Sequence, residues 1–370
     1  MNSKNPLERY LYKKIINNPN GGAGDREAHV LTAEESDRLR KIQIRSMFRA
    51  ALAGALGVVA LYVPHYAYGT ALFPISSMTL PFMSDPIEVE VTFLLYSFIL
   101  VVIEIAYLTY NNIHTVKDIA HACNYPLPDD PFFETNVESL VAVGLERNIK
   151  SQSQIGINPF AGLSKWQVMM FTIINLMKAA MTNFLFKLLI KRALGRYAFR
   201  LLVDLAGIPI YAFWNAYAAR TVIKETRVRI MANPIIKDFS KKLYQEQWDN
   251  PEFVKELYYM LDFVAITKRK FHGNHYMLAL VILQEFGIKP DTDHEYDDEF
   301  LDRMEKASPK TIEGFSKINL LGMALDGVIS KKEELLIYTW RKKGIYNYTT
   351  EQTKEATREF FEGQGTISLV

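Results

Sequence analysis

The sequence predicts an all-α protein, in which a transmembrane helical hairpin and a second apolar helix pair precede a soluble helical domain. Two observations predict this order. The stretch from Ala50 to Val116 has no Lys or Arg over 67 residues, and its first 35 residues also lack Asp and Glu. About 20 apolar residues already suffice to cross a bilayer core. Residues 231–370, in contrast, carry 19 basic and 23 acidic side chains, which is typical of a water-soluble module.

Composition excludes several classes of protein. The chain has 370 residues, with 43 Lys and Arg against 41 Asp and Glu, and 49% of its residues are hydrophobic. These values exclude a disordered chain and a strongly basic chain that coats nucleic acid. Because residues 231–370 are acidic overall, no nucleic-acid partner is expected. The single cysteine, Cys123, excludes an intrachain disulfide and a CxxC zinc site.

Residues 1–46 are predicted to form cytoplasmic amphipathic and juxtamembrane helices. Pro6 suits the first turn of a short helix, and a turn-rich linker follows it at 17–25. Thr32 and Glu35 have the spacing of a capping box at the start of the next helix. Basic residues then precede the apolar run and favour the cytoplasmic face; they are Arg38, Arg40, Lys41, Arg45 and Arg49.

Residues 47–110 form the predicted transmembrane hairpin. Two runs, 47–66 and 91–110, are each long enough to span, and the second is too long for an ordinary strand. The small residues Ala53 and Gly57, four apart, permit close packing of helices. A cleaved signal peptide is not expected, because 46 residues precede the first run and a second run follows it.

The segments beside these two runs predict the orientation of the hairpin. Pro64 is expected to end or kink the first helix, and the connection 69–90 contains acids but no basic residue, which fits an outside loop. Residues 111–165 are predicted to be a cytoplasmic helical connection. The expected partner is therefore the lipid bilayer of a bacterial inner membrane, with the N and C termini in the cytoplasm. A buried hairpin in a soluble protein is the alternative.

The second apolar pair, within residues 166–230, allows two interpretations. Its segments 166–190 and 198–217 are long enough to span, yet both contain charged residues. If both crossed, the basic turn between them would lie outside, against the positive-inside rule. Four spans therefore stand beside two spans plus a shallow hairpin, and the pattern slightly favours the second. A helical stripe with a spacing of four suits the headgroup level; its residues are Arg192, Arg196, Arg200 and Asp204.

Two charged residues within the apolar segments form the candidate functional pair. Glu104 lies past the middle of the second span, and Lys178 lies near the middle of the third apolar segment. Ionisable residues at such depth are costly and are functional candidates. A Glu104–Lys178 pair lining a polar pathway would support transport of a small ion or solute. The favoured alternative is structural, with Glu104 near the interface and a snorkelling Lys178, since one acid and one base fall short of a transporter pattern.

Three segments carry a resemblance to a known family. They are IEIAYLTYNNI (103–113), YPLPDDPFFETNVESLVAVGL (125–145) and KRALGRYAFRLLVDLAGIPIYAFWNAYAARTVIKETR (191–227). Together they resemble the EcsC family of bacterial membrane-associated proteins, in which a basic helix leads to an apolar Pro-Gly turn, an Asn and a final amphipathic helix. Here the Asn is matched by Asn215. The resemblance covers roughly 50–230 and implies no established reaction, cofactor or catalytic residue.

Residues 231–370 are predicted to form a soluble helical domain with well-marked helix ends. Pro251 begins one helix, Gly287 ends the next at 274–286, and Ser308 precedes another. The first of these helices has apolar residues at helical spacing, namely Phe253, Leu257, Leu261 and Val264.

The segment MALDGVISKKE (323–333) is the most informative part of this domain. Gly327 is expected to close one helix, and Ser330 with Glu333 to form a capping box at the start of the next. The segment also resembles the signature of the TerB-like, tellurite-resistance-like helical domain. The matching positions are Ala324, Asp326, Gly327, Ile329, Ser330 and Glu333.

Sites for metals and for catalysis are only weakly indicated. Asp326 and Glu333 are weak candidates for a shared divalent cation, and helix capping is favoured as their role. The acidic run 291–299 begins like an EF-hand loop but has Tyr296 where the turn requires Gly, so a solvated loop is expected. His272 and His275 lack further ligands at zinc spacing.

No cofactor motif or catalytic constellation is recognised, so a non-enzymatic role is expected. The domain 231–370 is expected to bind a partner protein or to sense a condition at the membrane. The sequence does not identify the partner, the ligand or the oligomeric state.

Overall fold

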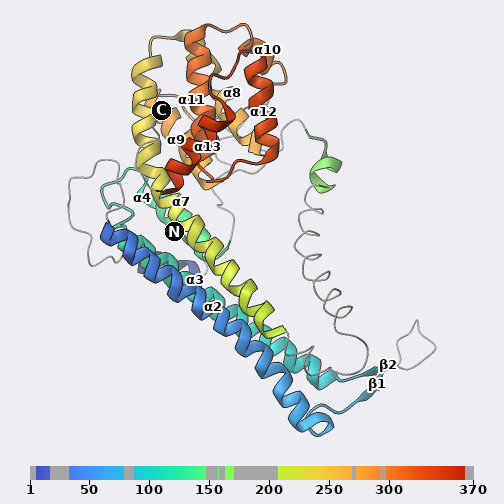
Figure 1. Ribbon diagram of the computed structural model, residues 1–370. Helices are drawn as coiled ribbons and strands as arrows, with labels where there is room; N and C mark the ends of the chain where they lie inside the picture. Colours follow the sequence, from blue (N-terminus) through green and yellow to red (C-terminus); the bar gives the residue numbers. More distant parts are fainter. Residues whose placement is uncertain are drawn as a thin grey trace. The chain divides into compact units, whose positions relative to one another are not determined.

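The computed structural model describes residues 6–16, 33–78, 87–146, 157, 163–170, 207–268, 272–291, 294 and 297–362. These residues are predominantly helical, with one pair of three-residue strands, which confirms the predicted all-α class (Figure 1). They form two compact units. Unit 1 comprises the described residues of 1–37, 120–170 and 225–370, and unit 2 comprises those of 38–119 and 171–224. Each unit is therefore discontinuous in sequence.

Unit 2 is built on an antiparallel pair of long helices, α2 (Ala33–Tyr68) and α3 (Val91–Ala122) (Figure 1). Each is long and apolar enough to cross a membrane. Both extend beyond the runs 47–66 and 91–110, because polar residues continue the helices. Ser46 and Asn111 join one end of the pair through a 3.0 Å hydrogen bond from Asn111 Nδ2 to Ser46 Oγ.

The connection between α2 and α3 is more ordered than the predicted loop. α2 continues one turn beyond Pro64, and a 3₁₀ turn η1 (Gly69–Ala71) follows it. Strands β1 (Ser76–Met78) and β2 (Ile87–Val89) then pair antiparallel. Phe73 is buried here, with its ring centroid 5.3 Å from that of Phe93. Aromatic packing therefore closes this end of the hairpin.

Helix α7 (Gly207–Gln247) has 41 residues and contributes to both units. Its residues 207–224 belong to unit 2 and its remaining residues to unit 1. The helix is continuous through residue 231, where the sequence had suggested the start of the soluble domain. One rigid element therefore supplies side chains to each unit.

In unit 1, helix α1 (Pro6–Ile16) packs on α4 (Phe133–Gly144). Leu11 and Ile15 are buried, so the apolar face of the predicted amphipathic helix is used within the protein. The Tyr12 hydroxyl donates a 2.5 Å hydrogen bond to Glu134 Oε1. Burial raises the pKa of Tyr12, and the Glu134 carboxylate raises it further, to about 12.

The C-terminal helices of unit 1 enclose one apolar core. The predicted face of α8 is buried throughout, and Gly322 lets α11 approach it, since a Cβ there would lie 2.5 Å from Val264 Cγ1. The helices are α8 (Pro251–Lys268), α9 (Gly273–Glu285), α10 (Phe300–Met304), α11 (Pro309–Ala324), α12 (Lys331–Lys342) and α13 (Thr350–Glu362) (Figure 1).

The helix ends predicted in this module are confirmed. Ser308 caps α11 by accepting the backbone N–H of Thr311, and Ser330 with Glu333 forms the capping box of α12. Gly287 and Gly327 have φ of +65° and +70°, a conformation that glycine adopts without strain. Local capping chemistry therefore sets the lengths of these helices.

Candidate functional site

Glu104 of α3 contacts a polar partner on α7. Asn215 Nδ2 donates a 2.6 Å hydrogen bond to Glu104 Oε1. Both residues belong to unit 2, and the bond joins positions 111 residues apart in sequence. A hydrogen bond to a charged acceptor is stronger than one between neutral groups. The pair therefore links α3 to α7 among otherwise apolar side chains.

Two glycines of α2 make room for this pair. A Cβ at Gly54 would lie 2.6 Å from the backbone oxygen of Tyr211 and 2.7 Å from Asn215 Nδ2. A Cβ at Gly57 would lie 3.3 Å from Glu104 Oε2. The closest approach of α2 to α7 is thus at Gly54, whereas the sequence had suggested Ala53 and Gly57. Small residues allow such backbone contact between apolar helices.

The other half of the predicted polar pair, Lys178, lies outside the described residues. The predicted stripe of Arg192, Arg196, Arg200 and Asp204 also lies outside them. Of the third apolar segment, 166–190, only 166–170 are described. The Glu104–Lys178 pairing and the number of spans therefore stay predictions.

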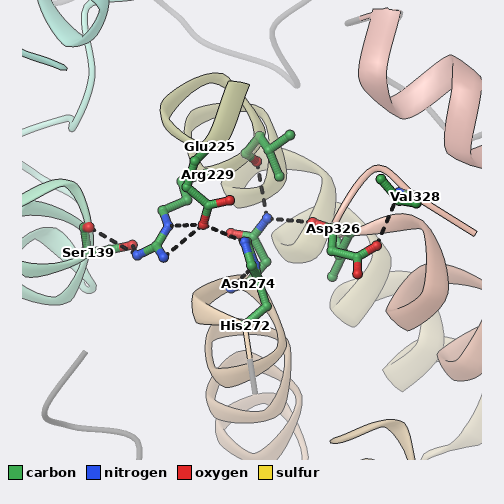
Figure 2. A network of polar contacts seen from close by, with 9 residues as sticks. Ser139, Glu225, Arg229, His272, Asn274, Asp326 and Val328 are labelled. Carbon is green, nitrogen blue, oxygen red and sulfur yellow. Dashed lines mark hydrogen bonds and ion pairs between the residues drawn. The ribbon is translucent and has the colours of Figure 1, made fainter. Parts of the chain in front are cut away.

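A second polar site lies in unit 1, where four segments meet (Figure 2). Arg229 of α7 donates to Ser139 Oγ of α4 at 2.8 Å and to the Ser139 backbone oxygen at 3.0 Å. The same guanidinium contacts Glu225, one helical turn earlier, at 2.8 and 2.9 Å. His272, just before α9, places Nε2 2.5 Å from Glu225 Oε1. We call this group of four side chains the polar junction.

The polar junction changes the acidity of its carboxylate. Burial alone would raise the pKa of Glu225, but the charge and hydrogen bonds of His272 and Arg229 outweigh it and lower the pKa to about 2. Glu225 is therefore ionised throughout the physiological range. An ionised Glu225 holds the N-terminus of α9 against α7.

Asn274 extends the contact region towards the turn between α11 and α12 (Figure 2). Its Nδ2 donates to the backbone oxygens of Leu325 at 2.8 Å and Val228 at 3.2 Å. Its backbone N–H donates to His272 Nδ1 at 3.1 Å. With Nδ1 accepting, the His272 proton lies on Nε2, facing Glu225. Asn274 therefore ties three backbone segments to the polar junction.

Asp130 organises a further cluster in the segment before α4. Its carboxylate lies 2.7 Å from Lys237 Nζ and accepts hydrogen bonds from Asn136 Nδ2 at 3.0 Å and Asn233 Nδ2 at 3.3 Å. It also accepts the backbone N–H of Phe132 at 2.9 Å. The Asp130 side chain is 4% exposed. A buried carboxylate with this many donors stabilises the turn and α4 without requiring a ligand.

The weak metal candidates, Asp326 and Glu333, have structural partners. Asp326 Oδ1 accepts the backbone N–H of Val328 at 3.2 Å, and Glu333 Oε2 accepts that of Ser330 at 2.9 Å. Within the described residues, no group of three or more His, Cys, Asp and Glu side chains is arranged to hold a metal ion. The residues of the TerB-like signature therefore shape a turn and a helix start.

Sequence reasoning missed both polar sites as groups. It had noted Asn215 within the EcsC-like segment and His272 as an isolated histidine, but it gave neither a partner. One signal was present: Glu225 and Arg229 have the spacing of four that brings opposite charges together on a helix. No family model, no curated protein and no solved structure matches the chain.

Proposed function

We propose that this protein is an integral membrane protein of the bacterial inner membrane, whose helical C-terminal module binds or senses a partner at the cytoplasmic surface. The observation that carries the proposal is the exposure of α3. No residue is buried in its most apolar window of 18 residues. A helix that is apolar on all sides requires either a protein interior or a lipid surrounding.

The exposed side chains of α3 cover every side of the helix. Leu94, Phe98 and Ile105 are 58%, 64% and 59% exposed. Their neighbours Leu95, Ile99, Val101, Val102 and Ile103 are also exposed. Leaving so many large apolar side chains in water would be strongly unfavourable, since each costs about 1.5–3 kcal/mol relative to burial. Lipid removes this cost without any further protein contact.

Flanking charges support an orientation with both ends of the hairpin in the cytoplasm. Arg49 precedes the apolar part of α2, and Lys117 follows that of α3. Between them no basic side chain other than histidine occurs. The positive-inside rule places Arg49 and Lys117 on the cytoplasmic side and the connection between the helices outside.

The start of α7 fits the same membrane level. Its exposed aromatic residues Tyr211, Phe213 and Tyr217 precede Arg220 and Lys224, a sequence typical of a membrane interface. Gly57, beside Glu104, follows Arg49 by about 12 Å of helix. The Glu104–Asn215 pair would thus lie inside the hydrocarbon region, where a satisfied hydrogen bond is needed.

Cysteine accessibility tests this proposal directly, because Cys123 is the single cysteine. In a Cys123→Ser background, Thr70→Cys reports the connection after α2 and Lys241→Cys reports the module. We expect a membrane-impermeant maleimide to label Thr70→Cys in intact spheroplasts and to label Lys241→Cys only after permeabilisation. Labelling of both without permeabilisation, or a monodisperse full-length chain without detergent, contradicts the proposal.

A further inference from the structure

The outward face of α12 combines large apolar side chains with basic ones. Leu335 and Tyr338 are each 66% exposed, and Val328, in the preceding turn, is 51% exposed. Leu335 and Tyr338 are three residues apart and therefore share a face. The opposite face of the helix is buried in the core. We call this outward surface the α12 stripe; it also includes Lys331, Lys332, Arg341 and Lys342.

The basic side chains of the α12 stripe are available for a ligand. All four are exposed, and within the described residues none has a carboxylate at ion-pair distance. The two acids of α12 are otherwise engaged, since Glu333 completes the capping box and Glu334 pairs with Lys354 at 2.9 Å. The stripe is therefore a local positive surface on a module with net negative charge.

We propose that the α12 stripe docks on an anionic lipid surface, with Leu335 and Tyr338 inserting among the headgroups and the four basic residues contacting lipid phosphates. This inference rests on the proposed membrane anchoring. Lys and Arg around Leu and aromatic residues are typical of helices that lie at a membrane interface, and anionic lipids attract each basic residue. Because the chain is anchored in the same bilayer, a weak contact suffices at high effective concentration.

Other occupants fit the α12 stripe less well. A second copy of the chain would bring two sets of four positive charges together, which is unfavourable. A stable protein interface needs about 800 Å² on each partner, and the stripe offers few large apolar side chains. A lipid surface needs no shape complementarity and supplies the opposite charge.

The test uses the full-length chain with Cys123→Ser and Thr339→Cys, labelled with an environment-sensitive fluorophore. Thr339 is exposed on α12 between the basic ends, and its replacement keeps Leu335 and Tyr338. The chain is reconstituted in phosphatidylcholine discs with or without phosphatidylglycerol. We expect a blue shift and quenching by spin-labelled lipid only with phosphatidylglycerol. The same label at Glu351→Cys on α13 should not respond.

Charge reversal provides the matched variant. Lys331→Glu with Lys342→Glu changes two exposed residues and should reduce the docked fraction by on the order of tenfold or more, since each basic residue contributes about fivefold. Insertion of the chain into both kinds of disc is scored separately by co-elution. A chain that inserts but shows no response to phosphatidylglycerol overturns the docking and leaves the anchoring intact.

The remaining outcomes also decide against the inference. A chain that does not enter discs removes the anchoring on which docking rests. An equal response in pure phosphatidylcholine contradicts the role of charge. A response in detergent that grows with protein concentration assigns the α12 stripe to a second copy. A photo-crosslinker at position 339 that yields one discrete protein adduct in native membranes assigns it to a protein partner.

Discussion

The side chain of Asn215 donates to that of Glu104 at 2.6 Å, across the helices α7 and α3. Both lie where α2 has glycines at 54 and 57. An apolar environment offers few other partners to a carboxylate, so the amide supplies a donor that lipid lacks. Glu104 therefore has a structural role in joining helices, whether or not it has a further role in function.

Removing either partner should destabilise unit 2. We expect Asn215→Leu to cost about 1–2 kcal/mol, because the carboxylate loses its donor. Glu104→Gln should cost less, since its amide oxygen still accepts from Asn215. Denaturation of the detergent-solubilised chain measures both effects. The double variant with Glu104→Leu should lose less than the sum of the single changes; strictly additive losses would show that the two side chains do not interact.

The two glycines of α2 should respond differently to the same substitution. In Gly54→Ala the new Cβ would lie 2.6 Å from backbone atoms of α7, which cannot move away without separating the helices. In Gly57→Ala it meets the movable Glu104 carboxylate at 3.3 Å. We expect Gly54→Ala to lower the unfolding temperature and Gly57→Ala to change it little. Equal effects of the two substitutions would contradict the observed packing of α2 on α7.

The polar junction predicts a loss of stability in acid. The folded pKa of Glu225 is about 2, below the usual value of about 4.3 in an unfolded chain. A lowered folded pKa stabilises above the unfolded pKa, and this contribution is lost as the pH falls from about 5 towards 2. Amide exchange in α9 should therefore quicken in acid relative to a Glu225→Gln variant.

The same variant provides the control for this prediction. At pH 7, Glu225→Gln should lose about 2 kcal/mol, because hydrogen bonds to a charged acceptor from Arg229 and His272 are weakened. In strong acid the difference between the two proteins should narrow, since both then carry a neutral side chain. A constant difference across this range would mean that Glu225 does not titrate as the geometry implies.

Local signals in the sequence account for most of the fold. The charge-free run predicted the α2–α3 hairpin, and residues such as Gly287 and Ser330 predicted helix ends, because capping depends on neighbours a few residues away. Contacts between distant residues have no such signal. Asn215 and Glu104 are 111 residues apart, and only packing selects Gly54 over Ala53 as the closest approach.

The start of α12 allows the competing roles of Glu333 to be separated. Glu333 accepts from the Ser330 backbone and hydroxyl at 2.9 and 2.7 Å, so its removal should destabilise the helix start. We expect Ser330→Ala to cost about 1 kcal/mol and Glu333→Gln to cost less, because glutamine completes the same capping box. A metal site would respond differently, since a divalent cation prefers carboxylate oxygens to a neutral amide. Thermal unfolding of the full-length chain with and without Ca²⁺ or Mg²⁺ makes the distinction: stabilisation by the cation that disappears in Glu333→Gln would assign a metal to Asp326 and Glu333, and unfolding temperatures independent of the cation would support the cap.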